Sequence, residues 1–255
     1  MSPEAALVPG RFDGRTVIVT GAGSGIGKAT ALRLAREGAT VVATDVVESR
    51  LTELVEENPG LTFVTVPGDI SAQEVVDRVV AAAGGRVDGL ANVAGIMDAF
   101  LPPAEVDDET WERVLRINLT APMRTTRAVL PLMLAAGKGA IVNVSSEASL
   151  RASASGVAYT ASKHAVNGLT KATAVFYKGD GVRCNAVAPG AVATNIEAPF
   201  HSAHAGAVLG PFMQAMVTSV AQPDELAALI AWLLSDDASN VNGAVIPCDG
   251  GWSAI

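Results

Sequence analysis

Residues Arg15–Gly27 read RTVIVTGAGSGIG, a short apolar run rich in β-branched residues that is followed directly by a glycine-rich turn. The apolar run predicts a buried strand over Arg15–Thr20, and the residues after it predict a helix over Gly25–Glu37 that ends at Gly38. Glycines at such a turn let a phosphate group approach the backbone, and the helix N-terminus adds free N–H groups and the positive end of its dipole. The stretch therefore predicts a strand–turn–helix unit that can bind phosphate.

Strand-like and helix-like segments alternate along the rest of the chain. Further strands are predicted at Thr40–Thr44, Leu61–Val66, Gly89–Val93, Ala140–Ser145, Val182–Ala188 and Ala244–Pro247. Further helices are predicted at Glu48–Glu57, Ser71–Ala83 with Ser71 as N-cap, Asp108–Ala136 with a kink near Pro122 or Pro131, Ser155–Tyr177 and Pro223–Ser235. This alternation indicates an α/β fold of the doubly wound Rossmann type, with a parallel seven-stranded sheet and helices on both faces.

No internal repeat, linker or break in composition divides residues 1–255, so we expect a single domain behind an N-terminal tail at residues 1–13. Hydrophobic residues make up 49% of the chain and charged residues 17%, which allows a large core and excludes a disordered chain. The segment Gly190–Gln222 has no clear period but contains apolar side chains. Long irregular segments in compact domains are usually functional, so this one is predicted to be a substrate-binding loop.

The acidic balance of the chain limits its partners. The formal net charge is −8 at pH 7, and such a surface repels the phosphate backbone of nucleic acids. No apolar run approaches the ~18 residues that a membrane span needs, and Met1–Gly10 lacks the features of a signal peptide, so a cytoplasmic location is expected. His201 and His204 have no third ligand beside them, so no metal site is expected. The lone Cys184 and Cys248 are expected to be small buried hydrophobes.

Asp45 ends the second predicted strand, about twenty residues past the glycines, where an acid would hold the ribose hydroxyls of an adenosine. A 2′-phosphate about 5 Å from this carboxylate would be repelled by several kcal/mol at an effective dielectric constant near 20. Val46 and Val47 follow Asp45, so no cation adjoins it in the sequence, and Lys28 is expected to point along its helix. The prediction is a preference for NAD over NADP.

Tyr159 and Lys163 are four residues apart in a predicted helix and therefore share one helical face. A free tyrosine has a pKa near 10, and lowering it by about 3 units takes about 4 kcal/mol. One ammonium group roughly 4 Å away supplies about that much at an effective dielectric constant of 20. A tyrosine with a lowered pKa can give a proton to a ketone oxygen or take one from an alcohol. By the spacing alone, a solvated surface pair is the better interpretation.

Several motifs occur in a fixed order, and together they resemble the short-chain dehydrogenase/reductase family from Gly14 to Trp252. They are Thr20-Gly-x-x-x-Gly-Ile-Gly27, Asn92-Val-Ala-Gly95, Asn118, Asn143-Val-Ser-Ser146, Tyr159-x-x-x-Lys163, Pro189-Gly190 with Thr194, and Asp249-Gly-Gly251. The family often has a second asparagine where this chain has Val93, whose packing we expect to take over the support of the sheet.

The resemblance implies a role for each matching residue. Tyr159 would be the acid/base, and Lys163 would hold the nicotinamide ribose and lower the tyrosine pKa. Ser146, with Ser145 as the alternative, would bind the substrate oxygen, and Asn118 would hold a water in a proton relay to Lys163. Asp69 and Ile70 would contact adenine, Asn92, Ala94 and Gly95 would line the cofactor, and Val192 and Thr194 would orient the carboxamide. The cofactor-binding set is Gly21, Ser24, Gly25, Ile26, Gly27, Asp45, Asp69, Ile70, Asn92, Ala94, Gly95, Tyr159, Lys163, Pro189, Gly190, Val192 and Thr194.

The resulting hypothesis is an NAD-dependent oxidoreductase of the alcohol dehydrogenase kind, acting on the CH–OH group of a secondary alcohol or on the matching ketone. One alternative is a 3-oxoacyl-thioester reductase, which usually takes NADPH and is therefore disfavoured by Asp45. The other is a non-catalytic protein that senses a dinucleotide, which the joint presence of Ser146, Tyr159 and Lys163 disfavours. The family resemblance also implies a homotetramer, built through the long helices and the last strand. The sequence does not specify the substrate. Met97, Leu150 and the apolar residues of the long loop are candidate walls of its pocket. Glu147 could recognise a polar group of the substrate, or it could be a solvated acid.

Overall fold

The computed structural model describes residues 6–195, 199–217 and 219–254. It contains one parallel sheet in the strand order β3-β2-β1-β4-β5-β6-β7. The strands are β1 Thr16–Thr20, β2 Thr40–Asp45, β3 Phe63–Pro67, β4 Gly89–Asn92, β5 Gly139–Val144, β6 Val182–Pro189 and β7 Val245–Cys248. The order reverses between β1 and β4, which places a binding crevice beyond the carboxyl ends of these two strands. The predicted seven-stranded doubly wound fold is therefore confirmed.

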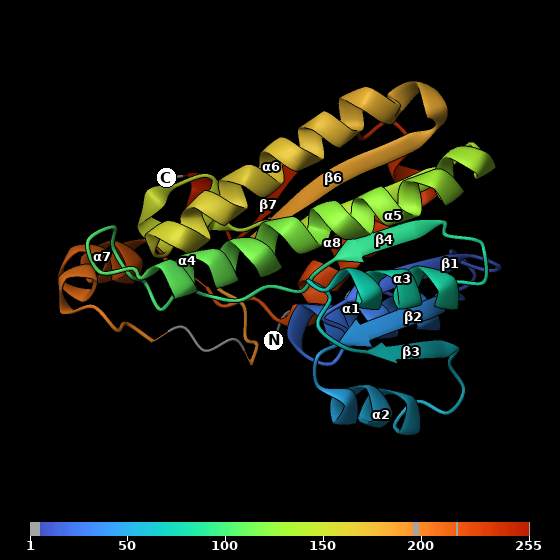
Figure 1. The fold of residues 1–255 in the computed structure, drawn as a ribbon, viewed down its shortest axis with the longest axis horizontal. Helices are drawn as coiled ribbons and strands as arrows, with labels where there is room; N and C mark the ends of the chain where they lie inside the picture. The colour runs from blue at the N-terminus through green and yellow to red at the C-terminus, as the bar shows by residue number, and fades with distance from the viewer. Residues whose placement is uncertain (1–5, 196–198, 218, 255) are drawn as a thin grey trace.

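Helices cover both faces of the sheet (Figure 1). They are α1 Gly25–Arg36, α2 Glu48–Glu56, α3 Gln73–Ala82, α4 Asp108–Leu115, α5 Ala121–Ala136, α6 Val157–Tyr177, α7 Ala203–Met216 and α8 Pro223–Leu234. Successive residues of β1 point to opposite faces, because Val17 and Val19 pack with α1 and α8 whereas Ile18 packs with α3 and α5. Two apolar cores, one on each face, therefore hold the sheet rigidly between helices.

The predicted helix over Asp108–Ala136 is interrupted by a π-helical turn at Arg116–Thr120, labelled η1. The turn lies just before Pro122, which occupies the first turn of α5. Pro131 lies inside α5. The turn carries Asn118, and π turns inside helices frequently mark functional positions.

The prediction that Gly190–Gln222 has no regular structure was wrong, because α7 lies within it. The Ser202 hydroxyl caps this helix by accepting from Ala205 N at 3.0 Å. Apolar residues occur all around α7, so its sequence has no polar face and shows no helical period. The helix lies beyond the carboxyl ends of the strands (Figure 1).

Smaller differences concern helix and chain ends. The N-cap of α3 is Ala72 and not Ser71, whose hydroxyl instead accepts from Arg116 at 2.7 Å. The described part of the predicted tail packs on the domain, because Phe12 is buried and Val8 N donates to Glu37 Oε1 at 3.2 Å. Residues 1–5 of that tail, and residues 196–198 and 218 of the predicted loop, lie outside the described part. Among the described residues, no helix is long and apolar enough to cross a membrane.

Candidate active site

The glycine-rich turn joins β1 to α1 and leaves no room for side chains. Gly21 has a φ of +67°, and a Cβ built there would lie 3.0 Å from Ala94 Cα. A Cβ at Gly27 would overlap the carbonyl oxygen of Gly21. Ser24 is the N-cap of α1, and its side chain makes no capping hydrogen bond. The turn is therefore a bare backbone cradle at a helix N-terminus, as the sequence predicts.

The segment after β6 lies against this cradle. A Cβ at Gly25 would lie 3.0 Å from Thr194 Cγ2. Val192 is held by a parallel bridge to Ala221, and Gly190 N donates to Cys248 O at 3.3 Å. The structure thus brings the predicted residues at both ends of the cofactor site together. These contacts fit a dinucleotide that runs from the glycine turn towards Thr194.

Asp45 lies at the carboxyl end of β2, as predicted, and its carboxylate is partly engaged by backbone. Its Oδ2 accepts from Gly23 N at 2.9 Å and its Oδ1 from Val47 N at 3.0 Å. The structure also brings the first side-chain carbon of Arg50 to this corner, which the residues next to Asp45 do not reveal. A Cβ at Gly23 would lie 2.8 Å from both Asp45 Cγ and Arg50 Cβ. Arg50 in the first turn of α2 is therefore a neighbour of the predicted ribose site.

Asp69 and Ile70, the two predicted adenine contacts, follow β3, which is the strand next to β2. Asp69 accepts from Ser71 N at 2.9 Å and pairs with Arg116 at 3.1 Å. Burial alone raises the pKa of Asp69, but its hydrogen bonds with Ser71 and Arg116 outweigh this and lower it. Ile70 is buried in the core under β3. Lys28 pairs with Glu57 at 3.0 Å and so points away from the glycine turn, as expected.

The Asn92 side chain forms hydrogen bonds with other buried side chains. Its Nδ2 donates to Asn143 Oδ1 at 2.8 Å, and its Oδ1 accepts from Thr125 Oγ1 at 2.7 Å. The side chain is buried, so only the backbone of Asn92 faces the crevice region. Sequence reasoning missed a neighbouring contributor, Thr20, whose hydroxyl accepts from Val93 N at 3.0 Å and from Ala94 N at 3.1 Å. This hydroxyl fixes the loop after β4 to the start of the glycine turn.

Asn118 holds the same loop from the other side. Its Oδ1 accepts from Ile96 N and its Nδ2 donates to Ile96 O, both at 2.9 Å. A Cβ at Gly95 would lie 3.3 Å from Asn118 Oδ1 and 3.5 Å from Lys163 Nζ. The predicted relay partners, Asn118 and Lys163, therefore meet around Gly95.

Ser146 and Tyr159 form the centre of the site. The two side chains share a hydrogen bond, and both remain partly exposed. Ser146 Oγ also accepts from Ala148 N at 3.1 Å, which orients the hydroxyl. Ser145 is buried, and its hydroxyl donates to Asn167 Oδ1 at 2.7 Å. The structure therefore favours Ser146 over Ser145 as the substrate-facing serine.

Lys163 lies on the same face of α6 as Tyr159, but the tyrosine pKa differs from the expectation. The Lys163 ammonium lies 5.4 Å from the centre of the Tyr159 ring and donates to Val144 O at 2.8 Å. Burial raises the pKa of Tyr159 to about 12, the hydrogen bond with Ser146 lowers it and the charge of Asp98 raises it. Burial also lowers the pKa of Lys163 to about 8. Desolvation thus moves the two pKa values in opposite directions, raising that of the tyrosine and lowering that of the lysine.

Glu147, the residue after Ser146, is buried rather than solvated. Its side chain is 1% exposed and pairs with Arg151 Nε at 3.0 Å. Burial raises the pKa of Glu147, Arg151 lowers it, and the nearby charge of Asp249 raises it. Arg151 also donates to Ser253 O, so this cluster joins the serine loop to the end of the chain. The sequence carries no signal for these long-range partners.

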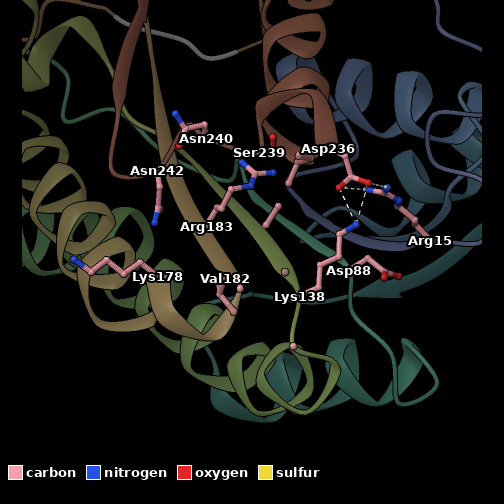
Figure 2. A pocket seen from close by; sticks show the side chains of 15 residues that line it. Arg15, Asp88, Lys138, Lys178, Val182, Arg183, Asp236, Ser239, Asn240 and Asn242 are labelled. Atoms are coloured by element: carbon pink, nitrogen blue, oxygen red, sulfur yellow. Dashed lines mark hydrogen bonds and ion pairs between the residues drawn. The ribbon is translucent and has the colours of Figure 1, made fainter.

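A separate depression of about 610 Å³ lies at the opposite edge of the sheet, among the amino ends of β1, β5 and β6 (Figure 2). Its charged side chains are paired locally, because Asp236 binds Arg15 at 2.5 Å and Lys138 at 2.8 Å. Arg183 there donates to the carbonyl oxygens of Leu233 and Ser235. Ligands of parallel sheets bind at the carboxyl ends of the strands, so this depression is not the active site.

Comparisons with known proteins agree with this geometry. Residues 15–205 match the profile of the short chain dehydrogenase family. The chain is 42% identical over 252 residues to the short-chain dehydrogenase/reductase cdmF of Talaromyces verruculosus, covering 94% of this chain and 97% of that protein. It is 41% identical over 254 residues to 3beta-hydroxysteroid dehydrogenase 2 of Eggerthella lenta, covering 94% and 95% respectively.

A solved structure from Beutenbergia cavernae superposes with a TM-score of 0.85 and 38% identity, covering 97% of this chain and 100% of that one. That protein is provisionally named an NAD(P)-dependent gluconate 5-dehydrogenase and holds NADP at low occupancy. The ordered motifs, the cradle and the matched relatives lead to one conclusion: this chain belongs to the short-chain dehydrogenase/reductase family of oxidoreductases.

Proposed function

We propose that this chain transfers a hydride between NAD and a secondary alcohol or ketone, with Tyr159 as the group that moves the hydroxyl proton. The observation that carries the proposal is that the partly exposed residues Ser146 and Tyr159 bring their hydroxyls next to each other at the carboxyl end of the sheet. The Lys163 ammonium lies 5.4 Å from the tyrosine ring on the same helical face. Two hydroxyls and one ammonium group in this order suit the binding and protonation of a carbonyl oxygen.

A bound nicotinamide dinucleotide would supply or accept the hydride. Ser146 Oγ accepts from Ala148 N, and its own proton, which lies near the Tyr159 phenol, would turn to the substrate oxygen when a substrate binds. Tyr159 gives its proton to that oxygen during reduction of a ketone and takes it back during oxidation of an alcohol. Lys163 and Asn118 meet around Gly95, where a proton path from Tyr159 towards solvent can run.

The preference for NAD rests on the Asp45 carboxylate at the ribose site. Its negative charge repels a 2′-phosphate, and its oxygens can accept from ribose hydroxyls. Arg50 works in the opposite direction, because a guanidinium near this corner attracts a phosphate. We therefore expect NAD to be preferred and NADP to be accepted at a lower kcat/KM rather than excluded.

An apolar, alicyclic alcohol or ketone is the substrate class that we favour. Leu150, Phe200, Val208 and Phe212 are large apolar side chains left exposed around α7 and the serine loop. One of the relatives above is named a hydroxysteroid dehydrogenase, which supports a bulky apolar substrate. A 3-oxoacyl thioester stays the alternative within the same chemistry.

The deciding experiment replaces Tyr159 by phenylalanine and measures turnover and dinucleotide affinity together. Tyr159→Phe should lower kcat by a factor of about 10² to 10⁴ and leave the Kd of NAD, read by fluorescence, nearly unchanged. The chain's other tyrosine, Tyr177 at the end of α6, provides the matched control, and Tyr177→Phe should keep full activity. A Tyr159→Phe variant with most of its activity would overturn the mechanism.

A substrate panel separates the candidate functions. Alicyclic secondary alcohols, open-chain alcohols and a 3-oxoacyl thioester would each be offered with NAD or NADH and followed at the nicotinamide absorption band. Turnover confined to the thioester, above all with NADPH, would favour the alternative enzyme. Dinucleotide binding without turnover of any compound would favour a sensor.

We further propose a homotetramer, as the family resemblance implies. Val175 and Phe176 on α6 are 65% and 78% exposed in the single chain, and Leu134 on α5 is also exposed. Burying such apolar side chains between two copies would stabilise their association. Light scattering of the purified protein measures the mass directly, and a monomeric mass at micromolar concentration would contradict the proposal.

A further inference from the structure

The helix that carries Tyr159 has no cap of its own. The N-cap residue of α6 is Gly156, which has no side chain with which to bind the free N–H groups of the first turn. Asp98, in the loop after β4, binds two of these N–H groups instead. Its Oδ1 accepts from Gly156 N at 3.2 Å and its Oδ2 from Tyr159 N at 2.9 Å. In an ordinary capping box, side chains of the helix itself bind these two N–H groups.

The close approach of Asp98 requires glycine at the N-cap. A Cβ at Gly156 would lie 2.5 Å from both Asp98 Oδ2 and Leu101 N. A serine or aspartate there, the usual local cap, therefore cannot share the space with Asp98. Asp98 is 1% exposed, and its N–H partners together with the positive end of the helix dipole suit a buried carboxylate.

The loop that presents Asp98 is strained. Ala99 and Phe100 have φ values of +55° and +58°, in the left-handed region that non-glycine residues rarely adopt. Each such residue costs conformational free energy. Two hydrogen bonds offset this cost, from Phe100 N to Asp98 Oδ1 at 3.2 Å and from Val157 N to Leu101 O at 2.9 Å. Backbone strain held in this way concentrates at functional sites.

The strained residues also contact the segment that precedes α7. Ala99 O accepts from His201 N at 3.2 Å. The Phe100 ring stacks on Phe200, with 4.2 Å between ring centres. Asp98 therefore stands where the loop after β4, the start of α6 and the segment before α7 meet.

We propose that Asp98 is a positioning residue, which sets Tyr159 relative to the loop of Gly95 and Ile96 and couples it to the Phe200–His201 segment. A local cap would order the first turn of α6 equally well, but it would not place that turn against another element. The inference rests on the proposed function, because it assumes that Tyr159 moves the proton. The groups that face the Tyr159 hydroxyl region are the Ser146 hydroxyl, the Lys163 ammonium and the Asp98 carboxylate.

The first test is Asp98→Asn, which keeps the size of the side chain but removes its charge and one acceptor. A small displacement of Tyr159 should lower kcat at least about ten-fold, with the Kd of NAD within about three-fold of the unmodified protein. The Asp98 charge raises the pKa of Tyr159, so its removal should also move the tyrosine-dependent limb of the kcat–pH profile to lower pH. A merely structural role would not move that limb. Unchanged kcat and an unchanged profile would overturn the proposal.

The second test separates placement from helix order. In the double variant Asp98→Ala, Gly168→Ala, the new alanine stabilises α6 without replacing the carboxylate, because a Cβ at Gly168 meets nothing within 4 Å. The thermal midpoint should return towards that of the unmodified protein while kcat stays low. Recovery of kcat together with the midpoint would show that only helix order matters, and the proposal would fail. If Asp98→Asn does not fold, this variant alone decides the question.

Asp88 provides the matched control at the far edge of the sheet. Its Oδ2 accepts from Thr16 N at 2.8 Å at the start of β1, so Asp88→Asn should cost stability without changing kcat or the pH profile. Tyr159→Phe separates the two levels of the argument. If Tyr159→Phe is inactive but Asp98→Asn is fully active, the positioning role alone fails. If Tyr159→Phe is active, the proposed function fails first.

Discussion

Lys163 donates its ammonium proton to Val144 O at 2.8 Å, and its Nζ lies 5.4 Å from the centre of the Tyr159 ring. The lysine thus joins α6 to the carboxyl end of β5 at the point where the serine loop begins. Burial lowers the pKa of Lys163 to about 8 in the folded protein, from 10.5 for the free side chain. This difference can be measured as a dependence of stability on pH.

The first prediction concerns that dependence. Between pH 8 and pH 10.5 the unfolded lysine binds more protons than the folded one, so the contribution of Lys163 to stability rises with pH in this window. Relative to Lys163→Met, the unmodified protein should gain on the order of 3 kcal/mol on going from pH 7 to pH 10. The pKa of Tyr159, raised to about 12, adds a loss only above pH 10.

Urea unfolding without added dinucleotide, at pH 7, 8.5 and 10, provides the measurement. Lys171→Met removes an exposed lysine from the same helix and serves as the control, with an expected effect near zero. Parallel curves for the unmodified protein and Lys163→Met would show that the ammonium of Lys163 is not desolvated.

The second prediction concerns the choice of dinucleotide. Asp45→Asn removes the charge that repels a 2′-phosphate, so the ratio of kcat/KM for NADP to that for NAD should rise by about ten- to a hundred-fold. Adding Arg50→Gln should take back much of this gain, because Arg50 is the cation that the fold brings beside Gly23. Steady-state kinetics with both cofactors measure the ratio.

Lys28→Gln is the control for these variants, since Lys28 pairs with Glu57 and lies away from Asp45. It should leave the ratio unchanged. If Asp45→Asn keeps the original ratio, the discrimination between NAD and NADP lies at other residues. If the double variant Asp45→Asn, Arg50→Gln has the same ratio as Asp45→Asn alone, Arg50 does not contact the 2′-phosphate.

The third prediction concerns the polar network between the central strands. Asn143 accepts from Asn92 at 2.8 Å and donates to Thr170 at 2.9 Å, and it is buried. Asn143→Ala leaves the Asn92 amide without its acceptor in a dry interior and should cost about 2–4 kcal/mol of unfolding free energy. Asn58→Ala, at the half-buried end of α2, should cost about 1 kcal/mol or less. Equal losses in the two variants would contradict the importance of the buried network.

The sequence predicts elements whose evidence is local. The β-branched run at Arg15–Thr20 and the four-residue spacing of Tyr159 and Lys163 each carry a period or a turn signal within a few residues, and the structure places them as expected. The helix α7 was missed because its apolar residues leave no polar face to show a period. The π turn around Asn118 was missed because one extra residue in a helical turn leaves no trace in composition.

The remaining features depend on contacts between distant segments. Asp98 lies 61 residues before Tyr159, whose N–H it binds, and no local pattern marks an acid as the cap of another element. The expected lowering of the tyrosine pKa used only the attraction of one ammonium and left out burial. Desolvation depends on what the whole chain packs around the hydroxyl, so it becomes visible only in the fold.

The last prediction concerns Glu147, which is 1% exposed beside Ser146. Burial raises the pKa of Glu147 above that of a free glutamate, Arg151 lowers it, and the nearby Asp249 raises it. An acid with a raised folded pKa binds more protons when folded, so its contribution to stability is present at low pH and is lost as the pH rises through the folded pKa.

Glu147→Gln resembles the protonated form and does not titrate. The difference in thermal midpoint between Glu147→Gln and the unmodified protein should therefore shift in favour of the variant as the pH rises from 4.5 to 8. Glu56→Gln, at an exposed site at the end of α2, should show no such trend. A difference that shifts the other way with pH would mean that the ion pair with Arg151 dominates over burial, and that Glu147 is held as a carboxylate next to Ser146.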